Sequence, residues 1–188
     1  MNRPATLLVL LLAGLLAGCG GGSRPTGIRA AETPADDVAE YQPRWRSHTV
    51  DSTQYRKVFL AGTIDMGRSS DWQAALVARF RDSIGGRWLF FNPRRREFHA
   101  SPAEMEYQVA WELAHLEAAD LIVMNLLGDS RSPISLLEMG LYARSGKLFV
   151  ACSPDYYRYD NVRITCRRYG VPLYDSLTAL LDDLPQQS

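Results

Sequence analysis

The chain has 188 residues, and its 21 basic and 21 acidic side chains give a formal net charge of zero. This balance leaves no basic surface of the kind that binds nucleic acid, so we expect a small-molecule partner and no nucleic acid. The three cysteines form no CxxC motif and no cluster with histidine, which argues against a zinc site.

The first 18 residues have the pattern of a secretory signal peptide. Arg3 precedes an uncharged apolar run at residues 7–16, which is about half as long as the roughly twenty residues that span a bilayer. Residues 16–19 are Leu-Ala-Gly-Cys and resemble the lipobox of bacterial lipoproteins. We therefore expect cleavage before Cys19, a lipid on that cysteine, and anchoring to the cell membrane outside the cytoplasm. An ordinary secretory signal with a chance cysteine is the alternative.

Residues 19–53 are rich in Gly, Ser, Pro, Ala and Thr without a sustained hydrophobic period, which predicts a flexible tether after the lipidated cysteine. Gly20 stands where an aspartate would resemble an inner-membrane retention signal, so a Gram-negative host would place the protein on the periplasmic side of the outer membrane. The remaining residues, 54–188, have a common length for one domain. Within it, Cys152 and Cys166 fit either a disulfide or two buried thiols, and the thiol is favoured for Cys152 because it ends an apolar run.

Short apolar runs alternate with longer amphipathic segments in this domain. The apolar runs predict strands and the amphipathic segments predict helices. In chain order we expect a strand at 57–61, a helix at 71–84, a strand at 88–91, a helix at 102–118, a strand at 121–126, a helix at 133–145, strands at 148–151 and 171–174, and a helix at 176–184. The alternation predicts a three-layer α/β fold, flavodoxin-like or Rossmann-like, with a parallel sheet of about five strands and helices on both faces.

Ligands bind beyond the carboxyl ends of the strands in such sheets, which directs attention to the loops at 62–70, 92–101 and 128–132. Gly62 directly follows the first strand, where a glycine permits a ligand to approach the backbone closely, although a plain strand-to-helix turn also explains it. The loop lacks the GxGxxG spacing of dinucleotide-binding turns and the GxxxxGK[ST] of phosphate-binding loops. The glycine alone therefore names no ligand.

Two glutamates lie among apolar residues. Glu138 falls in the second turn of the helix predicted at 133–145, with Ser135 one turn earlier on the same face. A functional carboxylate and an exposed glutamate stabilised by the helix dipole both fit this pattern. Glu112 is also flanked by apolar residues. Nearby His115 is more typical of a surface or satisfied histidine than of a catalytic base, because no serine or cysteine nucleophile accompanies it.

Together these segments resemble the nucleoside 2-deoxyribosyltransferase family and the related 2′-deoxynucleoside 5′-phosphate N-hydrolases. The resemblance covers residues 57–175 and is most specific in the order of an Ala-Asp strand, a polar loop and the sequence Ser-Leu-Leu-Glu-Met-Gly. The matching segments are 59–64, 71–73, 92–95, 108–113, 119–123 and 135–140, of which 92–95 and 108–113 match a bacterial and phage subgroup.

The resemblance implies that Glu138 is a catalytic nucleophile that attacks the anomeric carbon of a nucleoside, expels the base and holds a glycosyl ester until water or a second base takes it. Such a carboxylate stabilises an oxocarbenium-like transition state and splits one difficult step into two. The second catalytic carboxylate implied is Glu112, at a position where family members usually have aspartate. Neither a metal nor any other cofactor is required.

The resemblance also bears on the substrate. Ser132 matches the monophosphate hydrolases, whereas the transferases carry an aspartate there that contacts the base. Asp65 replaces the phosphate-binding arginine of those hydrolases, and its carboxylate would repel a phosphate, so an unphosphorylated nucleoside or related N-glycoside is expected. Arg94 and Arg95 could assist departure of the base or could form a solvated basic loop. The substrate-binding positions that the resemblance implies are Gly62, Thr63, Asp65, Asn92, Ser132, Ser135 and Asn161.

Asn161 resembles a residue that family members supply to a neighbouring subunit, which implies a homo-oligomer. Four functions stay open. Transfer and hydrolysis use the same nucleophile, and so would an N-glycohydrolase acting on a nucleotide such as NAD. A lipid-anchored protein could also keep the fold and bind a nucleotide-like ligand without turnover, although two carboxylates kept in an apolar setting argue against that function.

Overall fold

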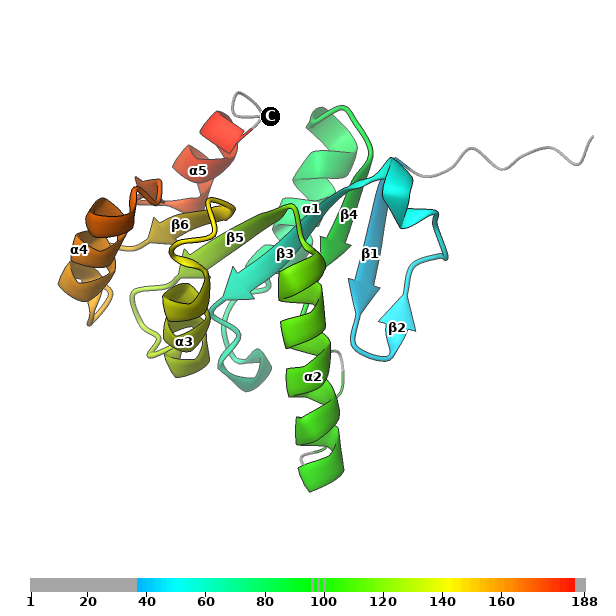
Figure 1. The fold of residues 1–188 in the computed structure, drawn as a ribbon, viewed down its shortest axis with the longest axis horizontal. Helices are drawn as coiled ribbons and strands as arrows, with labels where there is room; N and C mark the ends of the chain where they lie inside the picture. Colours follow the sequence, from blue (N-terminus) through cyan, green and yellow to red (C-terminus); the bar gives the residue numbers. More distant parts are fainter. Residues whose placement is uncertain (1–36, 96, 98, 100, 185–188) are drawn as a thin grey trace, which may run out of the picture. The chain divides into compact units, whose positions relative to one another are not determined.

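The central strands are built from the apolar runs of the sequence. They are β3 (Arg56–Gly62), β4 (Trp88–Phe91), β5 (Leu121–Leu126), β6 (Leu148–Cys152) and β7 (Leu173–Tyr174). Every residue of β4, β5 and β6 is buried, as expected for parallel strands whose two faces are both covered by helices. The predicted parallel α/β fold is confirmed (Figure 1), but the described residues form a sheet of seven strands where about five were expected.

The computed structural model describes residues 37–95, 97, 99 and 101–184, all within one compact unit. The predicted signal peptide, Cys19 and most of the predicted tether lie outside these residues. Among the residues described, no helix is long and apolar enough to span a bilayer.

The strand order in the sheet is β2-β1-β4-β3-β5-β6-β7, and all neighbours are parallel except β1 and β2. The five predicted strands, taken in chain order, lie as 2-1-3-4-5, which is the flavodoxin-like arrangement. In this arrangement the chain changes direction between β3 and β5, and ligands bind at the carboxyl ends of the strands there. The loops that follow β3 and β5 are therefore the ones that the fold brings to the candidate site.

The prediction of a flexible tether up to residue 53 is wrong for residues 38–46, which contain two strands. Strands β1 (Val38–Gln42) and β2 (Trp45–Arg46) form a hairpin, and β1 pairs in parallel with β4. Val38, Ala39 and Tyr41 are buried there. The strand is short and carries charged Glu40, so its sequence shows no long apolar run; pairing with β4 stabilises it.

Helices cover both faces of the sheet (Figure 1). The helices α2 (Pro102–Ala118), α3 (Pro133–Tyr142) and α4 (Tyr159–Tyr169) contribute to one hydrophobic core, and α1 (Trp72–Ser83) and α5 (Leu177–Asp183) contribute to the other. Side chains cap three of these helices at their first turns. The capping residues are Asp71, Ser101 and Ser176.

Helix α4 was not predicted, because only Val162 and Cys166 are buried along its polar sequence. Both cysteines of the domain are buried free thiols, so the predicted alternative of two thiols describes them and the disulfide does not. Burial raises the pKa of Cys152 to about 12 and that of Cys166 to about 11, which keeps both thiols protonated and unreactive.

Candidate active site

Glu138 lies in the second turn of α3 with only 8% of its surface exposed. Pro133 occupies the first turn of the helix, and Ser135, one turn before Glu138, is buried as well. Within the described residues the structure gives the Glu138 carboxyl no hydrogen-bond partner. Burial, followed by the charge of Glu112, raises the pKa of Glu138 to about 8. A buried carboxyl group without a partner is costly to a fold and is characteristic of a functional site.

Glu112 faces this group from α2 and is partly buried. Burial raises its pKa, and a hydrogen bond from Gln108 opposes that effect. Gln108 lies one turn earlier on α2; its Nε2 donates to Glu112 Oε1 at 2.8 Å and to the backbone oxygen of Pro93 at 3.1 Å. The backbone oxygen of Pro93 carries no hydrogen, which fixes the orientation of the amide. Gln108 thus holds Glu112 in place.

Two interacting carboxyl groups with raised pKa values can perform nucleophilic and acid–base chemistry. When Glu138 loses its proton, its charge is poorly solvated and is available to attack an electrophilic carbon. Because Glu112 already carries a hydrogen bond from Gln108, it is the better placed of the two to orient a ligand while Glu138 reacts.

A second polar cluster lies where β3 and β5 end. Thr63 Oγ1 and Ser132 Oγ lie 2.7 Å apart, and Ser132 Oγ lies 2.7 Å from Ser130 Oγ. Ser130 Oγ donates to Asp65 Oδ1 at 2.9 Å. At the other end, the backbone N–H of Leu127 donates to Thr63 Oγ1 at 3.1 Å. We call these four side chains, from Thr63 to Asp65, the hydroxyl chain.

The hydroxyl chain brings together three of the predicted substrate-binding residues. Thr63 follows β3, and its backbone N–H donates to Asn125 O of β5, which fixes the two loops side by side. Ser132 precedes α3 with a left-handed φ of 41°, and Asp65 also has a positive φ, of 48°. These conformations are uncommon for residues other than glycine, so the hydrogen bonds of the loop are needed to maintain them.

Two other predicted substrate-binding residues already have structural roles. Gly62 has a φ of 125°, and a Cβ atom there would lie 2.2 Å from the backbone oxygen of Asn125. The close approach that requires glycine is thus to β5, not to a ligand. Asn92 is buried; its Nδ2 donates to Glu40 Oε1 at 2.8 Å, and its Oδ1 accepts from the N–H of Arg94 at 3.0 Å.

The two arginines considered as aids to the leaving base are engaged elsewhere. Arg94 donates to the backbone oxygens of Gly67, Ser69 and Ser70 and thereby fastens the loop after β3. Arg95 forms an ion pair with Glu104 at 2.8 Å. The basic segment therefore holds loops together, and of the three candidates only Asp65 belongs to the cluster at the ends of β3 and β5.

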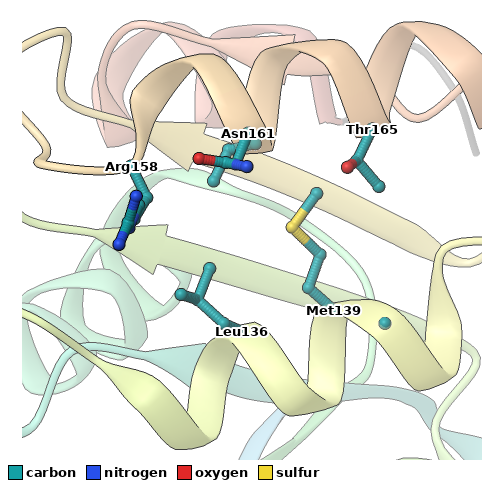
Figure 2. A pocket seen from close by; sticks show the side chains of 7 residues that line it. Leu136, Met139, Arg158, Asn161 and Thr165 are labelled. Carbon is teal, nitrogen blue, oxygen red and sulfur yellow. The ribbon is translucent and has the colours of Figure 1, made fainter.

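Asn161 lies in a different place from the carboxyl pair. It lines a groove of about 300 Å³ between α3 and α4. Figure 2 shows Asn161 and Thr165 of α4, with Arg158 directly before that helix, opposite Leu136 and Met139 of α3. Neither Glu138 nor Glu112 lines this groove, so a role for Asn161 at the carboxyl pair of its own chain is not supported by its position.

His115 has the packing expected of a satisfied histidine. Its ring stacks on Trp111 with a centroid distance of 3.9 Å and meets the edge of Phe91. Its Nδ1 lies 2.7 Å from the backbone oxygen of Trp111. Burial lowers the pKa of His115, so the ring is neutral at physiological pH. No group of side chains in the described parts of the chain could hold a metal ion.

Two residues of the site, Gln108 and Ser130, were not predicted from the sequence. The spacing of four residues between Gln108 and Glu112 places both on one side of a helix, and that spacing was a usable signal. Ser130 had no such signal, because serines are common in polar loops and its partners come from two other segments.

Comparison with known proteins supports the family resemblance. Residues 55–156 match a family model described as nucleoside 2-deoxyribosyltransferase like. The crystal structure of a conserved protein from Enterococcus faecalis V583 superposes with a TM-score of 0.52 at 15% sequence identity, covering 71% of this chain and 99% of that one. At this identity the likeness concerns the fold alone. No curated protein matches the chain significantly.

Proposed function

Because the chain belongs to the nucleoside 2-deoxyribosyltransferase-like family, we propose that it cleaves the N-glycosidic bond of nucleosides, with Glu138 as the nucleophile. The observation that carries the proposal is the buried residue Glu138 beside Glu112, with a carboxyl group that has no hydrogen-bond partner among the residues that the structure describes. Burial of a carboxyl group with no structural partner is destabilising, and a reaction that needs its charge explains why it is there.

The proposed reaction has two steps. Ionised Glu138 forms a C–O bond to the anomeric carbon as the C–N bond breaks, and the bonding electrons leave with the base, which takes up a proton. Water then hydrolyses the glycosyl ester, or a second base displaces Glu138. Glu112, held by Gln108, orients the sugar or the nucleophile.

The direct test measures base release. The full chain is incubated with a panel of nucleosides, nucleoside 5′-monophosphates and NAD, and the products are resolved by mass. Glu138→Ala should abolish base release while the circular dichroism spectrum stays that of the wild type. Glu106→Ala, at an exposed glutamate of α2, is the matched control and should retain activity. Turnover by Glu138→Ala equal to that of the wild type would reject Glu138 as the nucleophile.

The same products separate the remaining functions. Free base and free sugar indicate hydrolysis, exchange of one base for another indicates transfer, and nicotinamide release indicates action on NAD. Ligand binding without any product would indicate a binding protein. An unphosphorylated nucleoside is the substrate that the site favours, because the carboxylate of Asp65 lies in the hydroxyl chain, where a phosphate would be repelled.

The proposal extends to a second copy of the chain as a partner. The outer sides of α2 and α3 expose large apolar side chains at helical spacing. They are Met105, Val109 and Leu113 on α2, and Ile134, Leu137 and Leu141 on α3. An exposed apolar surface next to the carboxyl pair supports self-association close to the site, in agreement with the homo-oligomer that the family resemblance implies.

Lipid anchoring through Cys19 belongs to the proposal as well. The support is the signal-like first segment and the Leu-Ala-Gly-Cys sequence, which contains the predicted cleavage point. Metabolic labelling with a radioactive fatty acid should label the wild type and not Cys19→Ser. Equal labelling of both chains, or no labelling of either, would contradict the anchor and leave the proposed reaction unaffected.

A further inference from the structure

Asn92 and Pro93, directly after β4, connect the β1–β2 hairpin to α2. Asn92 is buried, and its Nδ2 donates to Glu40 Oε1 of β1 at 2.8 Å. The backbone oxygen of Pro93 accepts from Gln108 Nε2 of α2 at 3.1 Å. These two residues therefore join a strand that lies outside the match to the family model with the side chain that holds the second carboxyl group of the site.

A single peptide unit carries the orientation of Asn92 to Gln108. Asn92 Oδ1 accepts from the N–H of Arg94 at 3.0 Å, and this N–H belongs to the same peptide unit as the carbonyl group of Pro93. Because a peptide unit is planar, the hydrogen bond to Asn92 also sets the direction of that carbonyl group. The ring of Pro93 restricts the backbone further by fixing φ. The direction in which the carbonyl group meets Gln108 therefore depends on the side chain of Asn92.

The side-chain amide of Gln108 is the last link to Glu112. Its two Nε2 hydrogens lie in one plane, so the hydrogen donated to Pro93 fixes the direction of the one donated to Glu112 Oε1 at 2.8 Å. The oxygen of the same amide is buried and has no hydrogen-bond partner among the described residues. A buried acceptor without a partner is costly. That cost is explained if Gln108 is present for the two hydrogen bonds that its nitrogen donates.

We propose that Glu40 is a positioning residue for Glu112. It acts through the side chain of Asn92, the peptide unit that follows Pro93 and the side chain of Gln108, which together we call the amide relay. This inference rests on the proposed function, in which Glu112 orients the sugar or the nucleophile. A glutamate side chain is flexible, so support of this kind is needed to fix its carboxyl group. The hairpin thereby contributes to the reaction without touching the substrate.

The test measures kcat for base release by the full chain, with the nucleoside that the wild type cleaves fastest. Glu40→Ala removes the acceptor of Asn92 Nδ2, so kcat should fall about fivefold, the effect of one lost hydrogen bond. Glu40→Gln keeps an oxygen at the same place and should retain most of the activity. Recovery in the glutamine variant would connect the loss to the hydrogen bond with Asn92.

A double-mutant cycle distinguishes positioning from a general loss of stability. Gln108→Met keeps the length of the side chain but cannot donate to Glu112, so kcat should fall about tenfold. If Glu40 acts through Gln108, the variant with both substitutions should lose no more activity than Gln108→Met alone. Losses that multiply in the double variant would show two independent effects and would overturn the inference.

Arg44→Ala is the matched control. Arg44 lies in the turn of the same hairpin and donates to Glu104 and Tyr107 of α2, which lie outside the amide relay, so kcat should stay unchanged. If Glu40→Ala does not fold, Glu40→Met fills the same half-buried position without an acceptor and gives the same comparison. A kcat for these Glu40 variants equal to that of the wild type would overturn this inference and leave the proposed function intact. Absence of turnover by the wild type would overturn both.

Discussion

Burial determines how Glu138 can act. Away from water its ionised form is a stronger nucleophile, yet the same burial, with the charge of Glu112, holds its pKa near 8. The group is therefore mostly protonated at neutral pH. Gln108 acts through Glu112, because its hydrogen bond opposes the effect of burial on the pKa of that residue. The pH dependence of the reaction should thus depend on both carboxyl groups.

We expect kcat/KM for base release to rise about tenfold per pH unit below pH 8 and to level off above it, because Glu138 must be ionised to attack. Glu112→Gln removes a nearby negative charge, so the rising limb should move to lower pH even though the maximum rate falls. A pH–rate series on both proteins measures this shift. If the rising part of the pH–rate profile lies at the same pH in the wild type and in Glu112→Gln, Glu112 does not influence the ionisation of Glu138.

As pH rises, the free energy of unfolding should fall while the rate of base release increases. The pKa of Glu138 is about 8 in the folded chain against an ordinary value of 4.5, so the folded state binds the proton more tightly than the unfolded state. The free energy of unfolding therefore falls as pH rises from about 4.5 to 8, and the loss is about 3 kcal/mol at pH 7. At pH 7 the free energy of unfolding of Glu138→Gln should therefore exceed that of the wild type by this amount. Near pH 4 the two proteins should have similar free energies of unfolding.

Urea denaturation at both pH values measures the effect, with Glu106→Gln as an exposed control that should change neither value. A Glu138→Gln chain less stable than the wild type at pH 7 would mean that the ionised carboxyl is stabilised by contacts other than those described here.

The candidate site was predictable where a residue type conflicts with its surroundings. Glu138 and Glu112 stand out as charges among apolar neighbours, and the structure places them together. Gly62 also stands out, but its conformation serves a contact with Asn125 that only the sheet reveals. Ser130 belongs to the site through a hydrogen bond to Asp65 in another loop, and no local sequence pattern predicts such a hydrogen bond.

Strand β1 belongs to the sheet although its segment was predicted to be a tether. It lies outside residues 55–156, which match the family model, yet it pairs with β4 along four residues. Tyr41 of this strand is buried against Phe91, with ring centroids 6.2 Å apart, and its hydroxyl oxygen accepts from the N–H of Val50. The strand therefore completes the core beside β4.

Tyr41→Ala should lower the free energy of unfolding by about 3 kcal/mol, because it leaves a cavity next to Phe91. Tyr41→Phe keeps the ring and removes only the acceptor for Val50, so it should lose about 1 kcal/mol. Chemical denaturation of the two variants gives both values. Equal losses would show that the ring contributes nothing to packing and that β1 is not part of the core.

The sequence predicted the strands and helices that are rich in apolar residues and missed those with a mostly polar composition. Strands β3 to β6 are apolar runs, and α1 to α3 carry apolar residues at helical spacing. Helix α4 has a mostly polar composition and buries only two of its eleven residues, Val162 and Cys166, which lie one turn apart. Tertiary contacts decide such segments, and they are not visible in a local pattern.

For the whole molecule, the exposed apolar side chains of α2 and α3 are the main feature that a single chain leaves unexplained. Leu137 is 60% exposed and Leu141 is 57% exposed, on the same helix as Glu138. A second copy packed there would exclude water from the neighbourhood of the carboxyl pair, which would raise the pKa of Glu138 further.

A double variant, Leu137→Asp with Leu141→Asp, should therefore yield a monomer in light scattering under conditions where the wild type is a larger species. Two charges in an apolar interface are strongly unfavourable. Ile164→Asp on α4 is the control, because it introduces a charge at an exposed apolar residue outside the α2–α3 surface. A wild type that is monomeric at all concentrations would contradict self-association.

The most direct test of the account is detection of the glycosyl ester on Glu138. The full chain is mixed with excess nucleoside, quenched in acid within the first turnover and digested, and the peptides are analysed by mass spectrometry. We expect a sugar adduct on the side chain of Glu138, found in the peptide that contains this residue, and no adduct in Glu138→Gln. Rapid base release with the adduct on another residue, or with no adduct at any time, would contradict it.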